Sequence, residues 1–239
     1  VPYDKIIEGI VTAQSRQPNE DYLEYCQSMT EACSPGNEHL FAERDGLPLF
    51  WARRNFQSQE DRAIGFAYTF LGVRIECAQC HKHPWDQWTQ DDFHQFSRFF
   101  DAGRFGVAAD ADPAYRKLAG RVGLRVRDAQ EGAPIRSEHL ARARDGETIP
   151  WREVYVRPRE RSIRLGLLRQ VDVTLEPAED PRRVIMKWFR HPENPWFAKA
   201  IVNRVWASCF HVGIVDPPDD FNAANPPSTP DFLDWLASE

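Results

Sequence analysis

The chain has 239 residues, of which 42% are hydrophobic and 28% are charged, and its net charge is -6. This composition is ordinary for a globular protein and excludes an intrinsically disordered one. The mean hydropathy is -0.58, and no stretch of about eighteen apolar residues occurs, which excludes a membrane-spanning helix in this chain. No export signal is visible at Val1, and the chain stops at Glu239 inside an expected helix. We therefore expect a piece of a longer protein.

Two helices are expected near the N-terminus. Apolar residues recur there at the spacing of one helical face, namely Tyr3, Ile6, Ile7, Ile10 and Val11. A second helix is expected from about Glu20 to Ala32, because Ser34-Pro35-Gly36 would end it.

Two aromatic-rich helices are expected next. Residues 58–61 have the spacing of a capping box and open a helix that runs toward Ile75. Residues 89–92 give a second start signal, and phenylalanines follow on one face: Phe93, Phe96, Phe99 and Phe100. The segment between these two helices holds the most informative residues of the chain.

The second half of the chain is less regular. Residues 103–150 show weak periodicity, and short strands are expected at 154–156 and 171–175. Helical signals return at 181–190, at 195–210 after Asn194-Pro195, and after the cap at residues 228–231. The Arg-rich middle of the chain is interleaved with acidic residues, so we expect no nucleic-acid binding.

Five cysteines occur, and two of them form a motif. Cys77-Ala78-Gln79-Cys80-His81 has the Cys-x-x-Cys-His spacing of c-type haem attachment. Two intervening residues allow one tight turn to present both thiols to the two vinyl groups of a porphyrin, and the next residue offers an imidazole to the iron. Only about 0.003 such motifs are expected by chance in a chain of this composition. The motif therefore predicts one covalently bound haem c, attached through Cys77 and Cys80 with His81 as proximal iron ligand.

Three other interpretations of the cysteines stay open. A redox dithiol uses the same Cys-x-x-Cys spacing, although a helix rather than a strand precedes it here. A zinc site could combine Cys77 and Cys80 with Cys209 and His211. The remaining interpretation is a structural disulfide or two buried thiols. Separately, Cys26 and Cys33 are close enough in sequence for a local disulfide in an oxidising compartment.

The surroundings of the motif resemble a known family. The run from Phe70 to Phe93, with Cys77-Ala78-Gln79-Cys80-His81 at its centre, resembles the cysteine segment of planctomycete-type cytochrome c-like proteins. These are large exported proteins with two successive conserved domains of unknown function. The run from Asn194 to Trp206, followed by Gly213 to Pro217 and Asp219 to Phe221, is similar to the opening of the second domain.

The resemblance implies a division into three parts. Residues 1–103 would be a helical, c-type haem-binding segment at the end of the first conserved domain. Residues 104–180 would be an Arg-rich connecting region with short strands, and residues 181–239 the helical start of the second domain. The expected fold class is mainly α with a small β element and a haem-binding loop between two aromatic helices. Contact with the rest of a longer protein is also expected.

The sixth ligand of the iron would come from elsewhere in the chain. Because there are seven His and only two Met, two imidazoles are favoured, with a low reduction potential. His191 and His211 are the preferred distal ligands, since they flank the helix 195–210 and would tie the two halves of the chain through the iron. His83 is a candidate for a second metal site or a hydrogen bond at the haem edge. Arg204 is expected to pair with a haem propionate or with Asp216, Asp219 or Asp220.

The expected function is electron transfer by a c-type cytochrome-like protein in the periplasm or another extracytoplasmic space. One alternative is a haem enzyme of peroxidase type, which needs an open distal position. The other is a non-haem scaffold stapled by zinc. Nothing in the sequence identifies a redox partner protein or a substrate.

Overall fold

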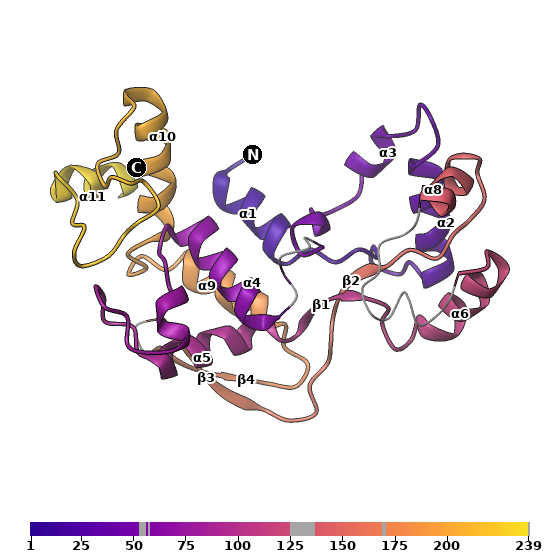
Figure 1. Ribbon diagram of the computed structural model, residues 1–239, viewed down its shortest axis with the longest axis horizontal. Coiled ribbons are helices and arrows are strands. Elements are labelled where there is room, and N and C mark those ends of the chain that lie inside the picture. The colour runs from indigo at the N-terminus through magenta and orange to yellow at the C-terminus, as the bar shows by residue number, and fades with distance from the viewer. Residues whose placement is uncertain (53–55, 57, 125–136, 169–170, 239) are drawn as a thin grey trace. The chain divides into compact units, whose positions relative to one another are not determined.

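The structure is a computed structural model that describes residues 1–239 except 53–55, 57, 125–136, 169–170 and 239 (Figure 1). Over the described residues, the fold is mainly α with two small antiparallel sheets, which confirms the expected mainly α class with a small β element. The chain divides into two compact units, residues 1–53 with 103–157 and residues 54–102 with 158–239. Each unit therefore combines two separate stretches of chain. Among the described residues, no helix has the length and apolar character needed to cross a membrane.

The first unit contains helices and one two-stranded sheet. Its elements are α1 (Tyr3–Val11), α2 (Tyr22–Ala32), α3 (His39–Ala42), η1 (Pro48–Phe50), β1 (Gly103–Gly106), α6 (Asp112–Arg121), α8 (Ser137–Arg144) and β2 (Glu153–Val156). The two helices expected near the N-terminus are confirmed. The second begins at Tyr22 because the side chain of Asp21 and that of Glu24 form a reciprocal capping box. Strand β1 and helices α6 and α8 lie in the stretch with weak periodicity, where the sequence predicted no element.

The core of the first unit encloses Cys26. This side chain is fully buried among tyrosine, alanine and leucine side chains of α2 and α6. Its Sγ accepts a hydrogen bond from the backbone N–H of Trp151 at 3.5 Å. Burial raises the pKa of the Cys26 thiol to about 11. Cys26 is thus a packing residue of this unit.

The local disulfide that the spacing of Cys26 and Cys33 allowed is not formed in this structure, in which both thiols are free. Cys26 lies in α2 and Cys33 is the residue that caps its C-terminus. Seven residues of helix rise about 10 Å, whereas the Cα atoms of a disulfide are at most about 7 Å apart. Proximity in the sequence therefore does not become proximity of the thiols.

The two stretches of the first unit are joined at β2. This strand pairs antiparallel with β1, with Gly103 opposite Val156. Arg16 donates from Nε to the buried Glu153 at 2.6 Å and from Nη1 to Asp110 at 2.7 Å. Burial raises the pKa of Glu153, with Arg16 opposing that rise. The N-terminal stretch is thereby fixed to the strand by a partly buried ionic contact.

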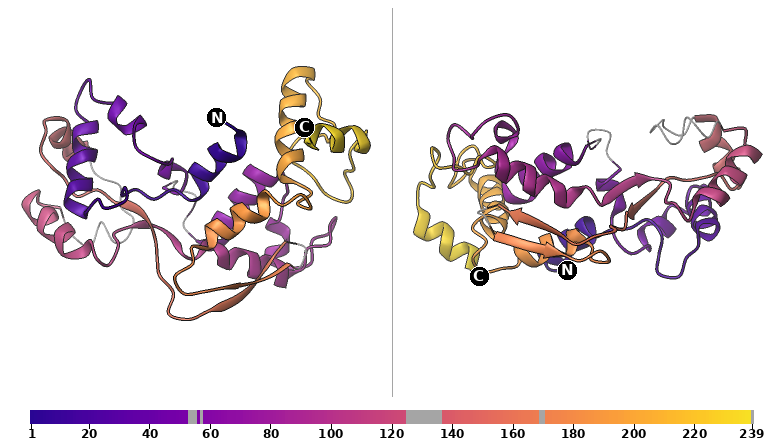
Figure 2. Two further views of the ribbon diagram at one scale, coloured as in Figure 1. Left: turned by 180° about the vertical axis from the view of Figure 1, so that it is seen from behind. Right: turned by 90° about the horizontal axis from the view of Figure 1, so that it is seen from below.

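The second unit contains the Cys-x-x-Cys-His motif. Its elements are α4 (Gln59–Phe66), η2 (Ala67–Leu71), η3 (Glu76–Gln79), α5 (Gln90–Ser97), η4 (Arg98–Phe100), β3 (Ile163–Leu167), β4 (Val171–Leu175), α9 (Pro181–Phe189), α10 (Phe197–Phe210) and α11 (Pro230–Ser238). Strands β3 and β4 form an antiparallel hairpin with Ile163 opposite Leu175, seen side by side in both views of Figure 2. The capping boxes expected at Ser58 and Thr89 are both present.

The first aromatic helix ends earlier than the sequence predicted. We expected it to reach Ile75, but α4 passes into a π-helical turn, η2, that stops at Gly72 with φ 65°. A Cβ at Gly72 would lie 3.1 Å from the ring of Phe221 and 3.4 Å from the side chain of Ala200. Glycine is required here by both the left-handed backbone and the close approach of α10.

The core of the second unit is aromatic and draws on both of its stretches. Phe66 stacks on Phe189 with ring centroids 5.2 Å apart, and Phe189 stacks on Phe197 at 4.6 Å. Phe96 lies edge-on to Phe100 at 5.3 Å. Aromatic rings at these separations attract one another beyond the area they bury. Helices α4, α5, α9 and α10 thus share one core.

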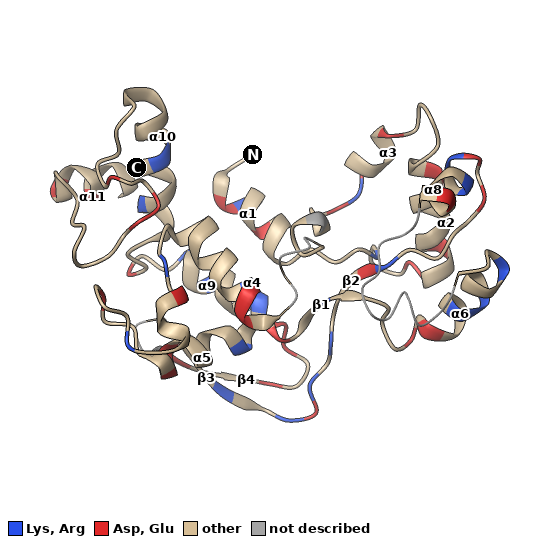
Figure 3. Ribbon diagram, in the orientation of Figure 1, with Lys and Arg blue, Asp and Glu red and all other residues tan. Residues whose placement is uncertain are grey.

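Charged residues are mixed along the Arg-rich region. Figure 3 shows blue and red segments side by side on α6 and α8. Arg116 pairs with Asp112 at 2.6 Å, and Arg142 pairs with Glu147. Arg164 pairs with Asp172 across the β3–β4 hairpin. These arginines therefore have acidic partners on the same element or close to it.

Candidate functional site

The two motif cysteines project from one side of a short turn. Cys77 lies within the 3₁₀ turn η3 and Cys80 caps it, with the N–H of Cys80 donating to the carbonyl of Cys77 at 3.4 Å. In a 3₁₀ turn, residues three apart lie one above the other. Both thiols are exposed and free. Ile75 and Ala78, also three apart, are fully buried and anchor the opposite side of the turn.

His81 follows the turn, and a hydrogen bond to its ring defines the tautomer. The ring is exposed, and its Nδ1 lies 2.7 Å from the carbonyl oxygen of Lys82. A carbonyl oxygen only accepts, so Nδ1 donates and carries the proton. The lone pair of the neutral ring is therefore on Nε2. A backbone carbonyl that fixes the tautomer in this way is the usual outer-shell partner of a metal-binding histidine.

His83 is held inside the loop that follows. Its backbone N–H donates to the carbonyl of Trp88 at 2.8 Å, which closes residues 83–88 into a compact loop. Its ring Nδ1 accepts from the N–H of Trp85 at 3.3 Å. Only 6% of His83 is exposed. His83 thus orders the loop, and its role at a second metal site stays a prediction.

Helix α5 holds the motif in place through a hydrogen bond to its backbone. The Nε2 group of Gln90, the first residue of α5, donates to the carbonyl of Gln79 at 3.2 Å. Trp88 is buried and lies 5.3 Å from Trp196 between ring centroids. The phenylalanines of α5 and η4 are fully buried in the protein core: Phe93, Phe96, Phe99 and Phe100. The aromatic side chain left at the surface beside the motif is that of Trp85, which is 65% exposed.

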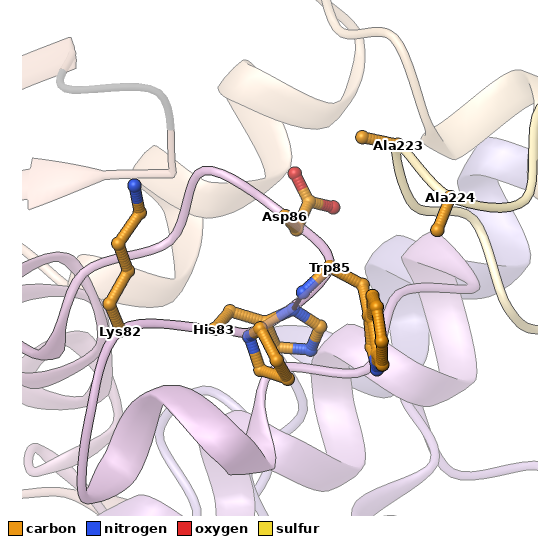
Figure 4. A pocket seen from close by; sticks show the side chains of 7 residues that line it. Lys82, His83, Trp85, Asp86, Ala223 and Ala224 are labelled. Atoms are coloured by element: carbon orange, nitrogen blue, oxygen red, sulfur yellow. Dashed lines mark hydrogen bonds between the residues drawn. The ribbon is translucent and has the colours of Figure 1, made fainter.

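A pocket adjoins the motif. Lys82, His83, Pro84, Trp85 and Asp86 line one side of it, and Ala223 and Ala224 line the other (Figure 4). Its volume is about 600 Å³, which lies within the range of small-molecule sites. Nothing in the sequence pointed to Ala223 and Ala224, because they reach the loop only through the tertiary fold.

The preferred distal ligands lie at the ends of helices. His191 follows α9, and its Nδ1 accepts from the N–H of Glu193 at 3.3 Å. His211 caps α10 with φ 65°. Both side chains are exposed. Their binding to an iron stays a prediction.

The proposed zinc ligands are not gathered into one site. Cys77, Cys80, Cys209 and His211 all belong to the described residues of the second unit. Across the described part of the chain, no three His, Cys, Asp or Glu side chains form a group that could hold a metal ion. The four-ligand set that the sequence allowed is thus not assembled in this structure.

Asn203 and Arg204 hold the surroundings of the motif. Asn203 is fully buried, and its side chain accepts from Val215 N–H at 3.0 Å and donates to the carbonyls of Val215 and Pro218. Arg204 pairs with Asp219 at 2.6 Å, one of the three acidic partners expected. Two polar residues next to each other in an apolar helix are unusual in a sequence. In the structure their side chains hold neighbouring segments of the chain in place.

The donor set of the motif fits a c-type haem. Attachment requires two free thiols on one side of a turn and an imidazole nitrogen with an available lone pair. Cys77, Cys80 and His81 meet these requirements. The phenylalanines of α5 and η4 are buried in the core and present no ring to a haem bound at the motif. The exposed indole of Trp85 could contact such a haem.

Comparison with known families finds one match at each end of the chain. The PSCyt2 family, described as a protein of unknown function (DUF1549), matches residues 1–104. The PSD1 family, described as a protein of unknown function (DUF1553), matches residues 181–239. The chain therefore carries, in succession, the two domains that characterise the planctomycete-type cytochrome c-like proteins. No curated protein and no solved structure shows a significant match to it.

Proposed function

We propose that this chain is a c-type cytochrome-like protein that binds one haem covalently and transfers electrons. Cys77 and Cys80 would form the two thioether bonds, and His81 would be the proximal ligand of the iron. The haem would supply one-electron chemistry between two oxidation states of iron. The observation that supports the proposal most is the turn that presents two free thiols on one side beside His81.

The chain's own residues would prepare this site before the haem arrives. Ile75 and Ala78 hold the turn so that neither thiol turns inward. The carbonyl of Lys82 keeps the proton of His81 on Nδ1, which leaves Nε2 for the iron. His191 or His211 would supply the sixth ligand. A sixth ligand from the chain favours electron transfer over the peroxidase-type alternative, because the iron then changes charge without changing partners.

The proposal includes an extracytoplasmic location. Thioether formation requires reduced thiols and haem delivered outside the cytoplasm, so the protein would mature in the periplasm or an equivalent space. The redox partner would be another protein, and the sequence does not specify it.

The test is expression of the full chain together with a c-type maturation system. We expect a pyridine haemochrome spectrum and a haem-stained band after denaturing electrophoresis. Replacing both motif cysteines, Cys77→Ser with Cys80→Ser, should abolish the stained band. Cys209→Ser is the matched control, since Cys209 is also exposed and free. It should keep the haem.

Two outcomes would contradict the proposal. The first is a wild-type protein without a Soret band under conditions in which a reference cytochrome matures. The second is a wild-type protein that purifies with one equivalent of zinc, which is lost in Cys209→Ser. The second result would support the zinc scaffold in its place.

A further inference from the structure

The pocket beside the motif is built from both family segments. Lys82 to Asp86 belong to the segment matched by PSCyt2, and Ala223 and Ala224 belong to the one matched by PSD1. All seven residues lie within the second compact unit. Lys82 directly follows His81, so the pocket begins where the proposed haem attachment ends.

His83 offers a hydrogen-bond donor to this pocket. Its Nδ1 accepts from the N–H of Trp85, so the proton of the neutral ring is on Nε2. Within the described part of the chain no hydrogen bond to that nitrogen is found, and Nε2 keeps some exposure to solvent although only 6% of the residue is exposed. This N–H is therefore available to donate to a ligand in the pocket. Figure 4 shows the His83 ring at the pocket between the Lys82 and Trp85 side chains.

The other side chains define what the pocket can accept. Lys82 brings an exposed ammonium group that forms no ion pair with the described residues. Trp85 brings an exposed indole face. Asp86 is directed to the Ala223 side of the pocket in Figure 4. A negative group would therefore bind through the Lys82 ammonium and the His83 donor rather than beside the Asp86 carboxylate.

We propose that the pocket takes the carboxylate-bearing edge of the haem, with His83 Nε2 donating to a propionate and Lys82 balancing its charge. This inference rests on the proposed function, because it assumes that the haem is attached at Cys77 and Cys80. The Trp85 indole would lie against the planar ring. The small side chains of Ala223 and Ala224 leave the space that the edge occupies. The PSD1 segment would thereby complete a site whose covalent bonds come from the PSCyt2 segment.

The test compares variants of the full, haem-loaded chain. His83→Ala and Lys82→Gln each remove one partner of the propionate. A propionate with fewer partners keeps more negative charge near the iron and stabilises the ferric state. Both variants should therefore lower the midpoint potential and shift the propionate bending band in the resonance Raman spectrum. Lys117→Gln, an exposed lysine on α6 in the first unit, is the control and should change neither.

A third variant approaches the pocket from its other side. Ala224 is exposed, so Ala224→Trp fills the space without entering the core. It should shift the same Raman band, whereas Ala109→Trp at an exposed position of the first unit should not. This variant keeps the inference testable if His83→Ala fails to fold.

The outcomes separate the two proposals. Variants that keep stoichiometric haem and have the wild-type potential and Raman band would overturn the proposed role of the pocket. They would leave the proposed attachment at Cys77 and Cys80 standing. A wild-type chain that takes up no haem would overturn both. If the potential and the Raman band shift in Lys82→Gln but the band does not shift in Ala224→Trp, the Lys82 charge acts on the iron without a propionate in the pocket. That result would overturn the pocket proposal.

Discussion

Arg204 and Asp219 form an ion pair in which Nε donates to Oδ1 at 2.6 Å. The same guanidinium donates to the carbonyl of Tyr68 at 2.8 Å and to that of Thr69. Those carbonyls belong to η2, the π-helical turn just before the Cys-x-x-Cys-His segment. One side chain from the segment matched by PSD1 therefore donates hydrogen bonds to two carbonyl groups of a helical turn in the segment matched by PSCyt2. The sequence predicted that Arg204 pairs with an acidic residue but not that it also donates to the carbonyls of η2.

Replacing Arg204 should loosen the second unit. Arg204→Ala removes a charge-assisted bond to Asp219 and the donors to two carbonyls, so we expect a loss of about 2 kcal/mol in the free energy of unfolding. The pair is largely shielded, with side-chain exposures of 26% and 25%. Urea unfolding followed by tryptophan fluorescence measures the change. The control is Arg164→Ala, whose pair with Asp172 is 73% and 50% exposed and should be worth about 0.5 kcal/mol or less. Equal losses in the two variants would contradict the role given to Arg204.

Phe189 should be among the most sensitive positions of the second unit. Its ring contacts Phe66 and Phe70 from the first stretch and Phe197 from the second. Phe189→Ala should cost about 3–5 kcal/mol, because it leaves a cavity among rings that cannot collapse fully. Phe232→Ala, at a position that is 37% exposed, should cost about 1 kcal/mol or less. Urea midpoints of the two variants give the comparison, and a Phe189→Ala protein as stable as Phe232→Ala would refute the shared aromatic core.

The cysteines of the first unit should behave as free thiols. Mass spectrometry of alkylated protein should find no bond between Cys26 and Cys33, even after export, because α2 separates them. Cys26 should resist labelling in the native protein, since it is buried with a pKa of about 11. At pH 8 about one thiol in a thousand is then ionised. Labelling of Cys26 should rise as the pH approaches 11 or when the protein unfolds. Rapid native labelling at pH 8, with Cys209 as the exposed reference, would argue against this placement.

The distal face of the iron decides between an electron carrier and an enzyme. With one imidazole from His81 and a second from His191 or His211, the ferric protein should give a low-spin electron paramagnetic resonance signal that resists cyanide. The ferrous protein should likewise resist carbon monoxide. Replacing the true distal ligand, His191→Ala or His211→Ala, should convert the signal to high spin, and the other variant serves as its control. A wild-type protein that is already high-spin and binds these ligands rapidly would favour the peroxidase-type alternative.

The sequence by itself determined the local structure around the motif. Capping residues Ser58 and Thr89 fixed where the flanking helices start, because a cap is a contact between residues three apart. The Cys-x-x-Cys spacing likewise determined that Cys77 and Cys80 share one side of a turn. The helix at 3–11 followed from apolar periodicity, and the helical signals at 181–190 correspond to the helix at 181–189. These features depend on neighbours along the chain, so one sequence is enough to predict them.

Only the tertiary structure decided which distant residues complete the second unit. Arg204 and Tyr68 are 136 positions apart, and the approach of Phe221 to Gly72 spans a similar length of chain. Such contacts form because burying the aromatic faces of α4, α5, α9 and α10 offsets the entropy of closing long loops. No local pattern encodes that choice, so the sequence could not place Ala223 and Ala224 beside His83. The same packing encloses the phenylalanines of one helix face, Phe93, Phe96, Phe99 and Phe100, and a ring fully buried among other rings has no face left for a cofactor.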